Sequence, residues 1–193
     1  FTPTSGIDTA AFSLPAYVRE DVRQNAPDSF VVGSVGRLSE EKNLAFLLQV
    51  FAELVKIRPS AQLWLVGDGP DRGMLEKRAE ELGIEPHVVF WGERDDVPRL
   101  LQGMDCFVMP SLHEGLGLAC LEAQAAGLPC VVSERVPRSV DVDGCIVRHV
   151  SLDAGPRVWT DEIAALDGRR IDDGAAFVRD AGFDIRDCAH ALA

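Results

Sequence analysis

Short apolar runs alternate with helical patterns along most of this chain, and that alternation limits the folds open to it. Each run is rich in β-branched or aromatic residues and is bounded by Gly, Pro or Asp, as is typical of buried parallel strands. The runs are FVVGSV (30–35), AQLWLV (61–66), HVVFW (87–91), DCFVM (105–109) and PCVV (129–132). A repeated strand–helix order predicts a parallel sheet covered by helices on both faces. We therefore expect an α/β fold with a Rossmann-like doubly wound sheet.

Helical patterns lie between these runs. In residues 43–57 apolar side chains recur at spacings of three and four, as on one face of an amphipathic helix. Further helices are expected at 71–82, 95–101 and 116–126, followed by weaker patterns for a sixth strand at 145–150 and helices at 156–166, 171–179 and 184–193. We expect one domain over 1–193, with a core at about 30–150 and C-terminal helices at about 156–193.

The charge balance argues against several classes of partner. The 193 residues include 31 acidic and 19 basic side chains, for a formal net charge of −12. Nucleic acids and anionic lipid surfaces both attract basic patches, so we expect neither a nucleic-acid partner nor a broad electrostatic membrane contact. The sequence has no apolar run long enough for a membrane span and no signal-peptide pattern, and it begins with Phe1. We expect a cytoplasmic segment of a longer protein.

The cysteines favour a reducing compartment. Their number is odd, none forms a CxxC pair, and all but the last lie among apolar neighbours. They are Cys106, Cys120, Cys130, Cys145 and Cys188. We expect buried free thiols, with no disulfides and no metal site.

Ligands of doubly wound sheets bind at the carboxyl ends of the strands, so function is expected in the loops that follow them. These loops cover 36–43, 67–70, 92–96, 110–117 and 133–137. The first contains Arg37 and Lys42 just before a helix. Free backbone amides, the positive end of the helix dipole and two cations suit a diphosphate. Two solvated surface charges are the alternative interpretation.

Two glutamates lie in or near the fourth loop. Glu114 precedes Gly115 and Gly117, whose small size lets a ligand approach the backbone, and the amides of residues 115–118 are expected to be free donors. A simple capping role for Glu114 is the alternative. Glu122 lies on an apolar helix, where a carboxylate needs hydrogen-bond partners unless it faces water. Eight helical residues span about 12 Å, close to the distance across a diphosphate from a sugar to a ribose.

A family resemblance follows from five pieces that occur in order. The chain resembles the C-terminal, donor-binding domain of family-four retaining glycosyltransferases, which forms one half of the GT-B fold. The pieces are GIDTAAF (6–12), VGRLSEEKN (35–43), LWLVGDGPDRGMLE (63–76), VVFWGERDDV (88–97) and MPSLHEGLGLACLEAQAAGLPCVVS (109–133). The segment EAQAAGLP and the C-terminal segment FDIRDCAHAL most resemble those of bacterial exopolysaccharide or capsule transferases.

The resemblance implies roles for the loop residues. Arg37 and Lys42 would bind the donor diphosphate, Glu114 the sugar hydroxyls and Glu122 the ribose. Retention implies a same-face, dissociative substitution in which Glu114 orients the sugar. The implied donor site also includes Gly36, Gly67, Gly92, Glu93, His113, Gly115, Leu116, Gly117 and Leu118, with the amides of 117 and 118 on phosphate or sugar and the loop at 92–93 near the base.

The implied activity is transfer of a hexosyl unit from a nucleotide-diphosphate sugar, with a UDP-sugar expected and no metal required. The acceptor would be a glycan or a lipid-linked molecule at the cytoplasmic membrane face. It would bind through an N-terminal domain that this chain lacks, so the fragment alone is expected to be inactive. Many family members have an aromatic residue where Leu116 stands, which leaves the sugar preference open.

Two other functions have weaker support from the residues. An epimerase of the same architecture would need acid–base residues, for which only His113 and Glu114 are candidates. A receiver-like regulatory module would need an acidic cluster where Arg37 and Lys42 lie.

Several further motifs carry no function. The Asp141–Val142–Asp143 triplet is expected to form a turn rather than a metal site. No dinucleotide fingerprint and no P-loop pattern occurs. Trp64 and Trp91 are expected in the core, with the latter a candidate for the border of the base site.

Overall fold

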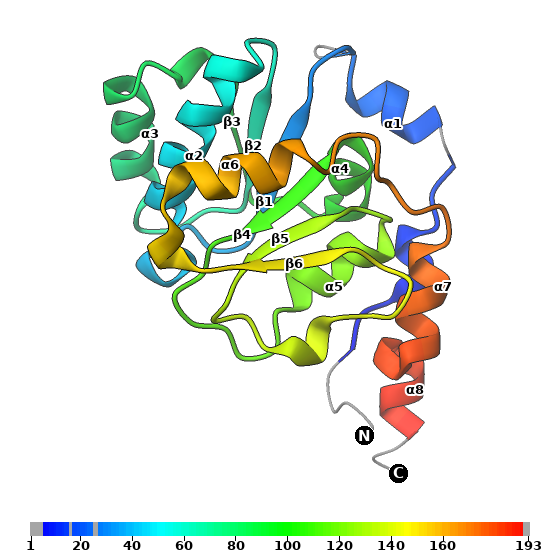
Figure 1. The fold of residues 1–193 in the computed structure, drawn as a ribbon. Helices are drawn as coiled ribbons and strands as arrows, with labels where there is room; N and C mark the ends of the chain where they lie inside the picture. Colours follow the sequence, from blue (N-terminus) through cyan, green and yellow to red (C-terminus); the bar gives the residue numbers. More distant parts are fainter. Residues whose placement is uncertain (1–5, 16, 25–26, 191–193) are drawn as a thin grey trace.

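A computed structural model describes residues 6–15, 17–24 and 27–190 (Figure 1). Its centre is a sheet of six parallel strands, and this confirms the predicted doubly wound fold and its sixth strand. The strands are β1 Val31–Val35, β2 Gln62–Val66, β3 Val88–Gly92, β4 Cys106–Met109, β5 Cys130–Ser133 and β6 Val147–Val150. Their order in the sheet is β3-β2-β1-β4-β5-β6, so β4 lies beside β1 and the winding reverses between these two strands.

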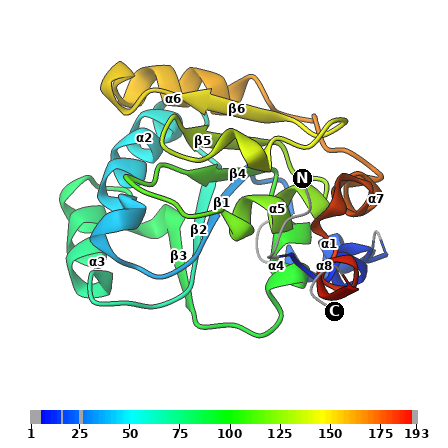
Figure 2. The same ribbon diagram turned by 90° about the horizontal axis from the view of Figure 1, so that it is seen from below.

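Helices cover both faces of the sheet. The helices are α1 Tyr17–Val22, α2 Leu44–Ile57, α3 Arg72–Glu81, α4 Val97–Gly103, α5 Leu118–Ala125, α6 Pro156–Ala164, α7 Gly174–Val178 and α8 Ile185–His190. Figure 2 shows α2, α3 and α6 on one side of the sheet and α4, α5 and α7 on the other. This two-sided cover explains why the strand sequences are apolar throughout rather than alternating with polar residues.

The side chains of each strand divide between the two faces. In β2, Leu63 and Leu65 pack under α2 and α3, while Trp64 and Val66 join the cluster under α4 and α5. The same alternation places Phe107 of β4 on the α5 side. Successive strand residues point to opposite faces, so each strand contributes to two separate hydrophobic clusters.

One helix was not predicted, and several predicted helix boundaries differ from the structure; the helix expected over 95–101, for example, is α4. The helix α1 was not predicted, because it buries none of its residues fully and so has no apolar period to detect. The helix expected from residue 116 begins at Leu118, because Gly117 adopts a left-handed conformation with φ of 79°. The helix expected over 171–179 is the shorter α7, which is followed by a π-helical turn, Arg179–Phe183.

The N-terminal and C-terminal segments of the described chain are joined to each other. Ile7 and Asp184 form a parallel bridge, in which the Ile7 amide donates to Phe183 and the Ile185 amide donates to Ile7. The buried Asp184 carboxylate accepts hydrogen bonds from Thr9 and from Arg186. These bonds hold the pKa of Asp184 well below its usual range, with the Arg186 side chain as the main cause.

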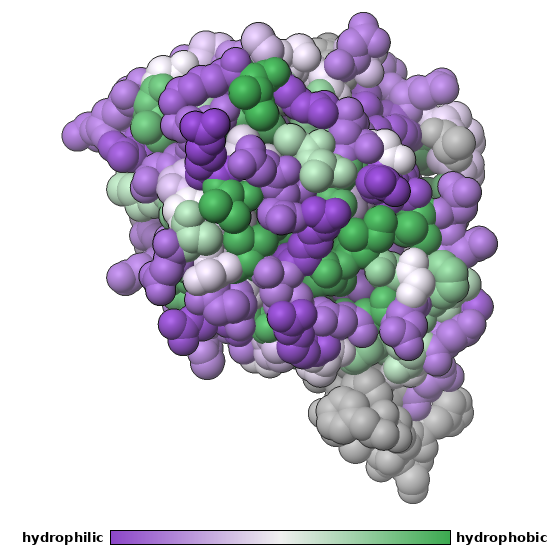
Figure 3. Space-filling view, viewed as in Figure 1, coloured by the Kyte–Doolittle hydropathy of each residue, from purple (hydrophilic) through white to green (hydrophobic). Residues whose placement is uncertain are grey.

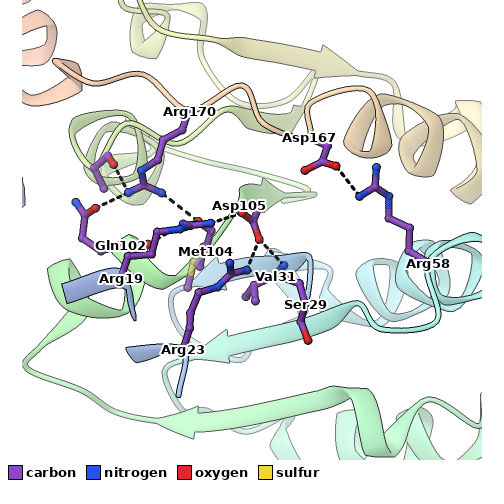
Figure 4. Close-up of polar contacts among 11 residues, drawn as sticks. Arg19, Arg23, Ser29, Val31, Arg58, Gln102, Met104, Asp105, Asp167 and Arg170 are labelled. Carbon is purple, nitrogen blue, oxygen red and sulfur yellow. Dashed lines mark hydrogen bonds and ion pairs between the residues drawn. The ribbon is translucent and has the colours of Figure 1, made fainter. Parts of the chain in front are cut away.

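A group of arginines joins α1 and the C-terminal segment to the amino end of the sheet (Figure 4). Asp105, just before β4, accepts from Arg19, Arg23 and the Val31 amide. Arg19 and Arg170 both donate to the carbonyl of Met104 at the end of α4, and Arg170 also donates to Ala126 at the end of α5. Helix C-termini carry negative partial charge, which compensates these partly buried cations.

Three of the four cysteines whose side chains the structure describes are buried as expected, and the face seen in Figure 3 is mostly polar. Figure 3 shows a mostly polar face with smaller apolar patches around β6 and α6. No helix within the described ranges is both long and apolar enough to cross a membrane. Cys106, Cys120 and Cys130 are buried free thiols, and Cys145 is half-buried and free. Burial raises the pKa of Cys145 to about 11. The side chain of Cys188 lies outside the described part.

Candidate functional site

The loops after β1 and β4 meet at the point where the winding of the sheet reverses. Three contacts join them. The Asn43 side-chain amide donates to the Pro110 carbonyl at 3.2 Å, and the Leu112 amide donates to the Glu41 carbonyl at 2.8 Å. The third contact is an ion pair of 2.5 Å between the Lys42 ammonium and the Glu114 carboxylate. Two residues predicted from separate motifs are therefore in direct contact.

The Glu114 carboxylate is held on one oxygen. Oε1 accepts from Lys42 Nζ and from the Ser111 hydroxyl at 2.8 Å, while Oε2 has no partner within the described chain. The Glu114 side chain is 9% exposed and that of Lys42 is 26% exposed. An ion pair of this limited exposure is screened less by salt than a surface pair. The free oxygen and the open side of the ammonium are the groups a ligand can reach.

Beside this pair lies an open cleft of about 770 Å³. It is lined by Gly36, Arg37, Gly67, Asp68, Gly69 and Glu93, which come from the loops after β1, β2 and β3. Arg37 and Glu93 are exposed, and in the described part of the chain neither makes an ion pair or a side-chain hydrogen bond. The cleft thus offers a cation and a carboxylate that are both free to bind.

Glycines form the floor of this cleft because the loops approach backbone to backbone. Gly67 has a φ of 125°, and a Cβ added to it would lie 2.0 Å from the Gly36 carbonyl oxygen. The Gly36 amide donates to Val66 at 2.9 Å, and the Gly67 amide donates to Gly92 at 2.8 Å. These two amides, one from the first loop and one from the second, are therefore already in use and are not available to a ligand.

The loop after β4 offers free amides. From Gly115 to Leu118, no backbone amide donates a hydrogen bond to any described residue. Gly117 begins the turn into α5, and Leu118 is an exposed residue at the start of that helix. Leu116 is half-buried and packs its side chain on the apolar cluster beneath α5. Several backbone donors that follow Glu114 thus have no acceptor within the described chain, which leaves them available to an anion.

Glu122 lies half-buried on α5. Its carboxylate has no hydrogen-bond or ion-pair partner among the residues the structure describes, and burial raises its pKa above the ordinary value. A carboxylate in this state is stabilised by any ligand that supplies hydroxyl donors. Because α5 begins at Leu118, the stretch from Glu114 is only partly helical, and the spacing of about 12 Å for a full helix does not apply.

A family model covers most of the region that builds this site. Residues 19–142 match the model described as glycosyl transferases group 1. The chain belongs to this family. The membership agrees with the resemblance to GT-B transferases and does not favour an epimerase or a receiver-like module.

Two individual relatives are similar in sequence to most of this chain. The EpsF protein of Bacillus subtilis is 37% identical over 163 residues, which cover 83% of this chain and 42% of EpsF. An Escherichia coli relative, named UDP-Gal:alpha-D-GlcNAc-diphosphoundecaprenol alpha-1,3-galactosyltransferase, is 32% identical over 75% of this chain and 38% of its own length. This chain therefore spans less than half the length of these two relatives.

Solved structures confirm the fold. The Anabaena protein HepE, in a crystal structure with UDP and glucose, superposes with a TM-score of 0.83 at 23% identity. The match covers 97% of this chain and 54% of the HepE chain.

The remaining candidate residues are more peripheral. His113 is exposed, and within the described ranges it has no polar partner. Trp91 is half-buried and packs edge-on against Trp64 at 5.3 Å, so it belongs to the core as expected. Asp143 lies in an exposed turn, and Asp141 bonds His149 at 2.7 Å. No group of three potential metal ligands occurs in the part of the chain that the structure describes.

Sequence reasoning missed three residues that shape the site: Asn43, Ser111 and Ser133. Asn43 has a φ of 53°, a left-handed conformation that is uncommon outside glycine and that Asn tolerates better than most residues. Its position between a loop and a helix is a detectable signal. The two serines gave no such signal, because buried serines have no periodic pattern.

Proposed function

We propose that this cleft binds a nucleotide-diphosphate sugar and that the chain is the donor half of a retaining glycosyltransferase. The observation that carries the proposal is the Lys42–Glu114 pair at the point where the sheet reverses its winding. Arg37 in the adjoining cleft and Glu122 on α5, the helix that follows the Glu114 loop, have no polar partner among the described residues. One ligand that combines two phosphates with two sets of hydroxyls satisfies all four charged groups.

The diphosphate would lie between the loops after β1 and β4. Arg37 and Lys42 supply cations, and the free amides of residues 115–118 supply donors. Hydrogen bonds between ionised partners are shorter and stronger than neutral ones. As the bond to the sugar breaks, charge grows on the departing diphosphate, and donors placed in advance stabilise that charge. These contacts need no metal ion.

The two glutamates would hold the ends of the donor. Glu114 Oε2 is open to hydroxyls of the transferred sugar, and Glu122 to the hydroxyls of the ribose. Glu93 and Gly92 would lie near the base. In a same-face substitution Glu114 orients the sugar and forms no covalent bond to it.

A UDP-sugar is the preferred donor. HepE was crystallised with UDP and glucose, and the name of the Escherichia coli relative includes UDP-Gal. Both relatives extend well beyond the matched region, and the acceptor would bind to such a further domain. The complete enzyme would transfer a hexosyl unit to a glycan or lipid-linked acceptor in surface polysaccharide synthesis, in the cytoplasm or at the inner membrane face.

Calorimetric titration with UDP, GDP and ADP tests the donor site. We expect UDP to bind, and Arg37→Ala and Glu122→Ala each to weaken that binding about tenfold or more, because each removes a charged hydrogen-bonding group. Arg157→Ala and Glu80→Ala remove exposed charges on α6 and α3 and serve as matched controls. If no nucleotide binds, or if the Arg37 and Glu122 variants bind like the parent, the proposed site is wrong.

A further inference from the structure

We propose that Ser111 is a positioning residue, which keeps the Glu114 carboxylate aimed at the donor sugar when Lys42 turns to the diphosphate. The inference rests on the proposed function. It assigns a role to Ser111, which is not among the donor-site residues that the family resemblance implies.

Ser111 lies two residues after the end of β4 and is bonded to the neighbouring strand. It is fully buried, and its carbonyl accepts a hydrogen bond of 2.6 Å from the hydroxyl of Ser133. Ser133 is also fully buried and ends the neighbouring strand β5. A hydrogen bond from the end of β5 therefore holds the Ser111 carbonyl, and the Ser111 hydroxyl donates to Glu114 Oε1.

Lys42 and Ser111 both donate to Glu114 Oε1, but their side chains differ in length and exposure. Lys42 reaches Oε1 from the loop after β1 through a long side chain that is 26% exposed. An ammonium has three donors and a flexible stem, so it can follow a stronger anion. A diphosphate in the cleft carries more charge than one carboxylate and would draw Lys42 toward itself.

When Lys42 turns away, Ser111 becomes the remaining partner of Glu114. Among the described residues, Oε1 accepts only from Lys42 and Ser111, and Oε2 accepts from none. Without the serine, a glutamate side chain with several rotatable bonds would be free to leave its position. With the serine, Oε1 stays fixed and Oε2 faces the sugar hydroxyls. The hydroxyl thus affects sugar recognition through Glu114 and does not touch the phosphates.

The test compares the affinities for UDP and for UDP-sugars. Calorimetry measures the Kd of UDP, UDP-glucose, UDP-galactose and UDP-N-acetylglucosamine with the parent, Ser111→Ala, Ser111→Cys and Ser34→Ala. Ser34 is a buried serine near the end of β1 with no bond to Glu114, and it is the matched control. The sugar preference is the Kd of UDP divided by the Kd of the UDP-sugar that the parent binds most tightly. We expect Ser111→Ala to lower this ratio about tenfold, while the affinity for UDP itself stays within about twofold of the parent value. Ser111→Cys keeps a weak donor, so its sugar preference should lie between those of the parent and of Ser111→Ala.

A double-variant cycle separates positioning from general damage to the fold. In a Glu114→Ala background, Ser111→Ala should cause little further loss of sugar preference, because the side chain through which the serine acts is absent.

The inference is overturned if Ser111→Ala and Ser111→Cys leave the sugar preference unchanged, or if they weaken the binding of UDP and UDP-sugars equally. It is also overturned if Ser111→Ala lowers the sugar preference as much in the Glu114 variant as in the parent. An equal affinity of the parent for UDP and all three UDP-sugars also overturns it, since Glu114 would then contribute nothing to the sugar. Absence of UDP binding to the parent instead overturns the proposed function.

Discussion

The two ends of the sheet use charged residues in opposite ways. At the amino end, Asp105 accepts from two arginines and a backbone amide, and Arg170 donates to carbonyls at the ends of two helices. At the carboxyl end, Arg37 and Glu122 have no partner in the described chain. The charges of this amino-end group are satisfied internally and stabilise the fold, whereas Arg37 and Glu122 at the carboxyl end are available to a ligand.

The contrast extends to the electrostatic state of single groups. Burial lowers the pKa of Arg170 to about 10, which leaves this guanidinium charged at neutral pH among its carbonyl acceptors. Burial raises the pKa of Glu122 without any compensating donor. Both groups are half-buried, but the first has hydrogen-bond partners and the second has none among the described residues. The following changes test whether this division between the two ends holds.

The largest effect is expected at the amino end, from Asp105→Ala. The change leaves two partly buried guanidiniums and the Val31 amide without their shared acceptor, so the free energy of unfolding should fall by about 3–5 kcal/mol. Urea denaturation measures the loss. The control Asp21→Ala breaks an exposed pair with Arg99 and should cost less than about 1 kcal/mol. Equal losses in the two variants would remove the distinction between the ends.

A second change tests the backbone of the carboxyl end. In Gly67→Ala the new Cβ would meet the Gly36 carbonyl in a conformation with φ of 125°, so we expect a loss of about 2–4 kcal/mol and weaker UDP binding. Gly73→Ala is the matched control, because no atom lies within 4 Å of its added Cβ and the residue is helical. It should stabilise by about 0.5–1 kcal/mol. Unchanged stability of the Gly67 variant would show that the cleft floor is adaptable.

Asp184→Asn tests a third, internally paired charge. Removing the carboxylate that binds Thr9 and Arg186 should cost about 1–2 kcal/mol at pH 7. Because the folded pKa of Asp184 is depressed, this contribution is present above the unfolded pKa of about 3.9 and is lost as pH falls toward the folded value. Thermal unfolding from pH 7 to 3 should show the difference between parent and variant shrinking. A difference independent of pH would contradict the role of the ionised carboxylate.

The smallest effect is expected from Glu122→Gln, and its sign is opposite. The raised pKa of Glu122 means that its ionised form destabilises the folded state above the pKa, so Gln should stabilise at pH 7 by less than about 1 kcal/mol. This gain should vanish at a pH low enough to protonate the parent. UDP binding should weaken in the same variant. Glu80→Gln on α3 is the control, and a destabilised Glu122 variant would indicate an internal partner.

The sequence predicts the strands and most site loops because their signals are local. The apolar runs at 30–35 and 105–109 lie within one residue of β1 and β4 at each end. The family motifs place Lys42 and Glu114 in loops at the ligand edge, and the structure brings them into contact. The sequence predicts a turn at Gly117. It does not predict the left-handed conformation of this glycine, because of which α5 begins later than expected.

Other features give no signal in the sequence. Asp105 and its partners Arg19 and Arg23 are more than eighty residues apart, with no shared pattern. The bond from Ser111 to Glu114 is local, but the Ser111 carbonyl is held by Ser133 in the next strand. Both arrangements depend on which strands become neighbours.

The sequence by itself determined the alternation of strands and helices, the carboxyl-end loops and the family. These follow from side-chain periodicity and short motifs, which are set within a few residues. Only the tertiary structure decided that β4 lies beside β1, that Lys42 pairs with Glu114, and that Glu122 has no partner within the described residues. The reason is physical: strand order and charge pairing arise from packing between distant segments, so each depends on the whole core.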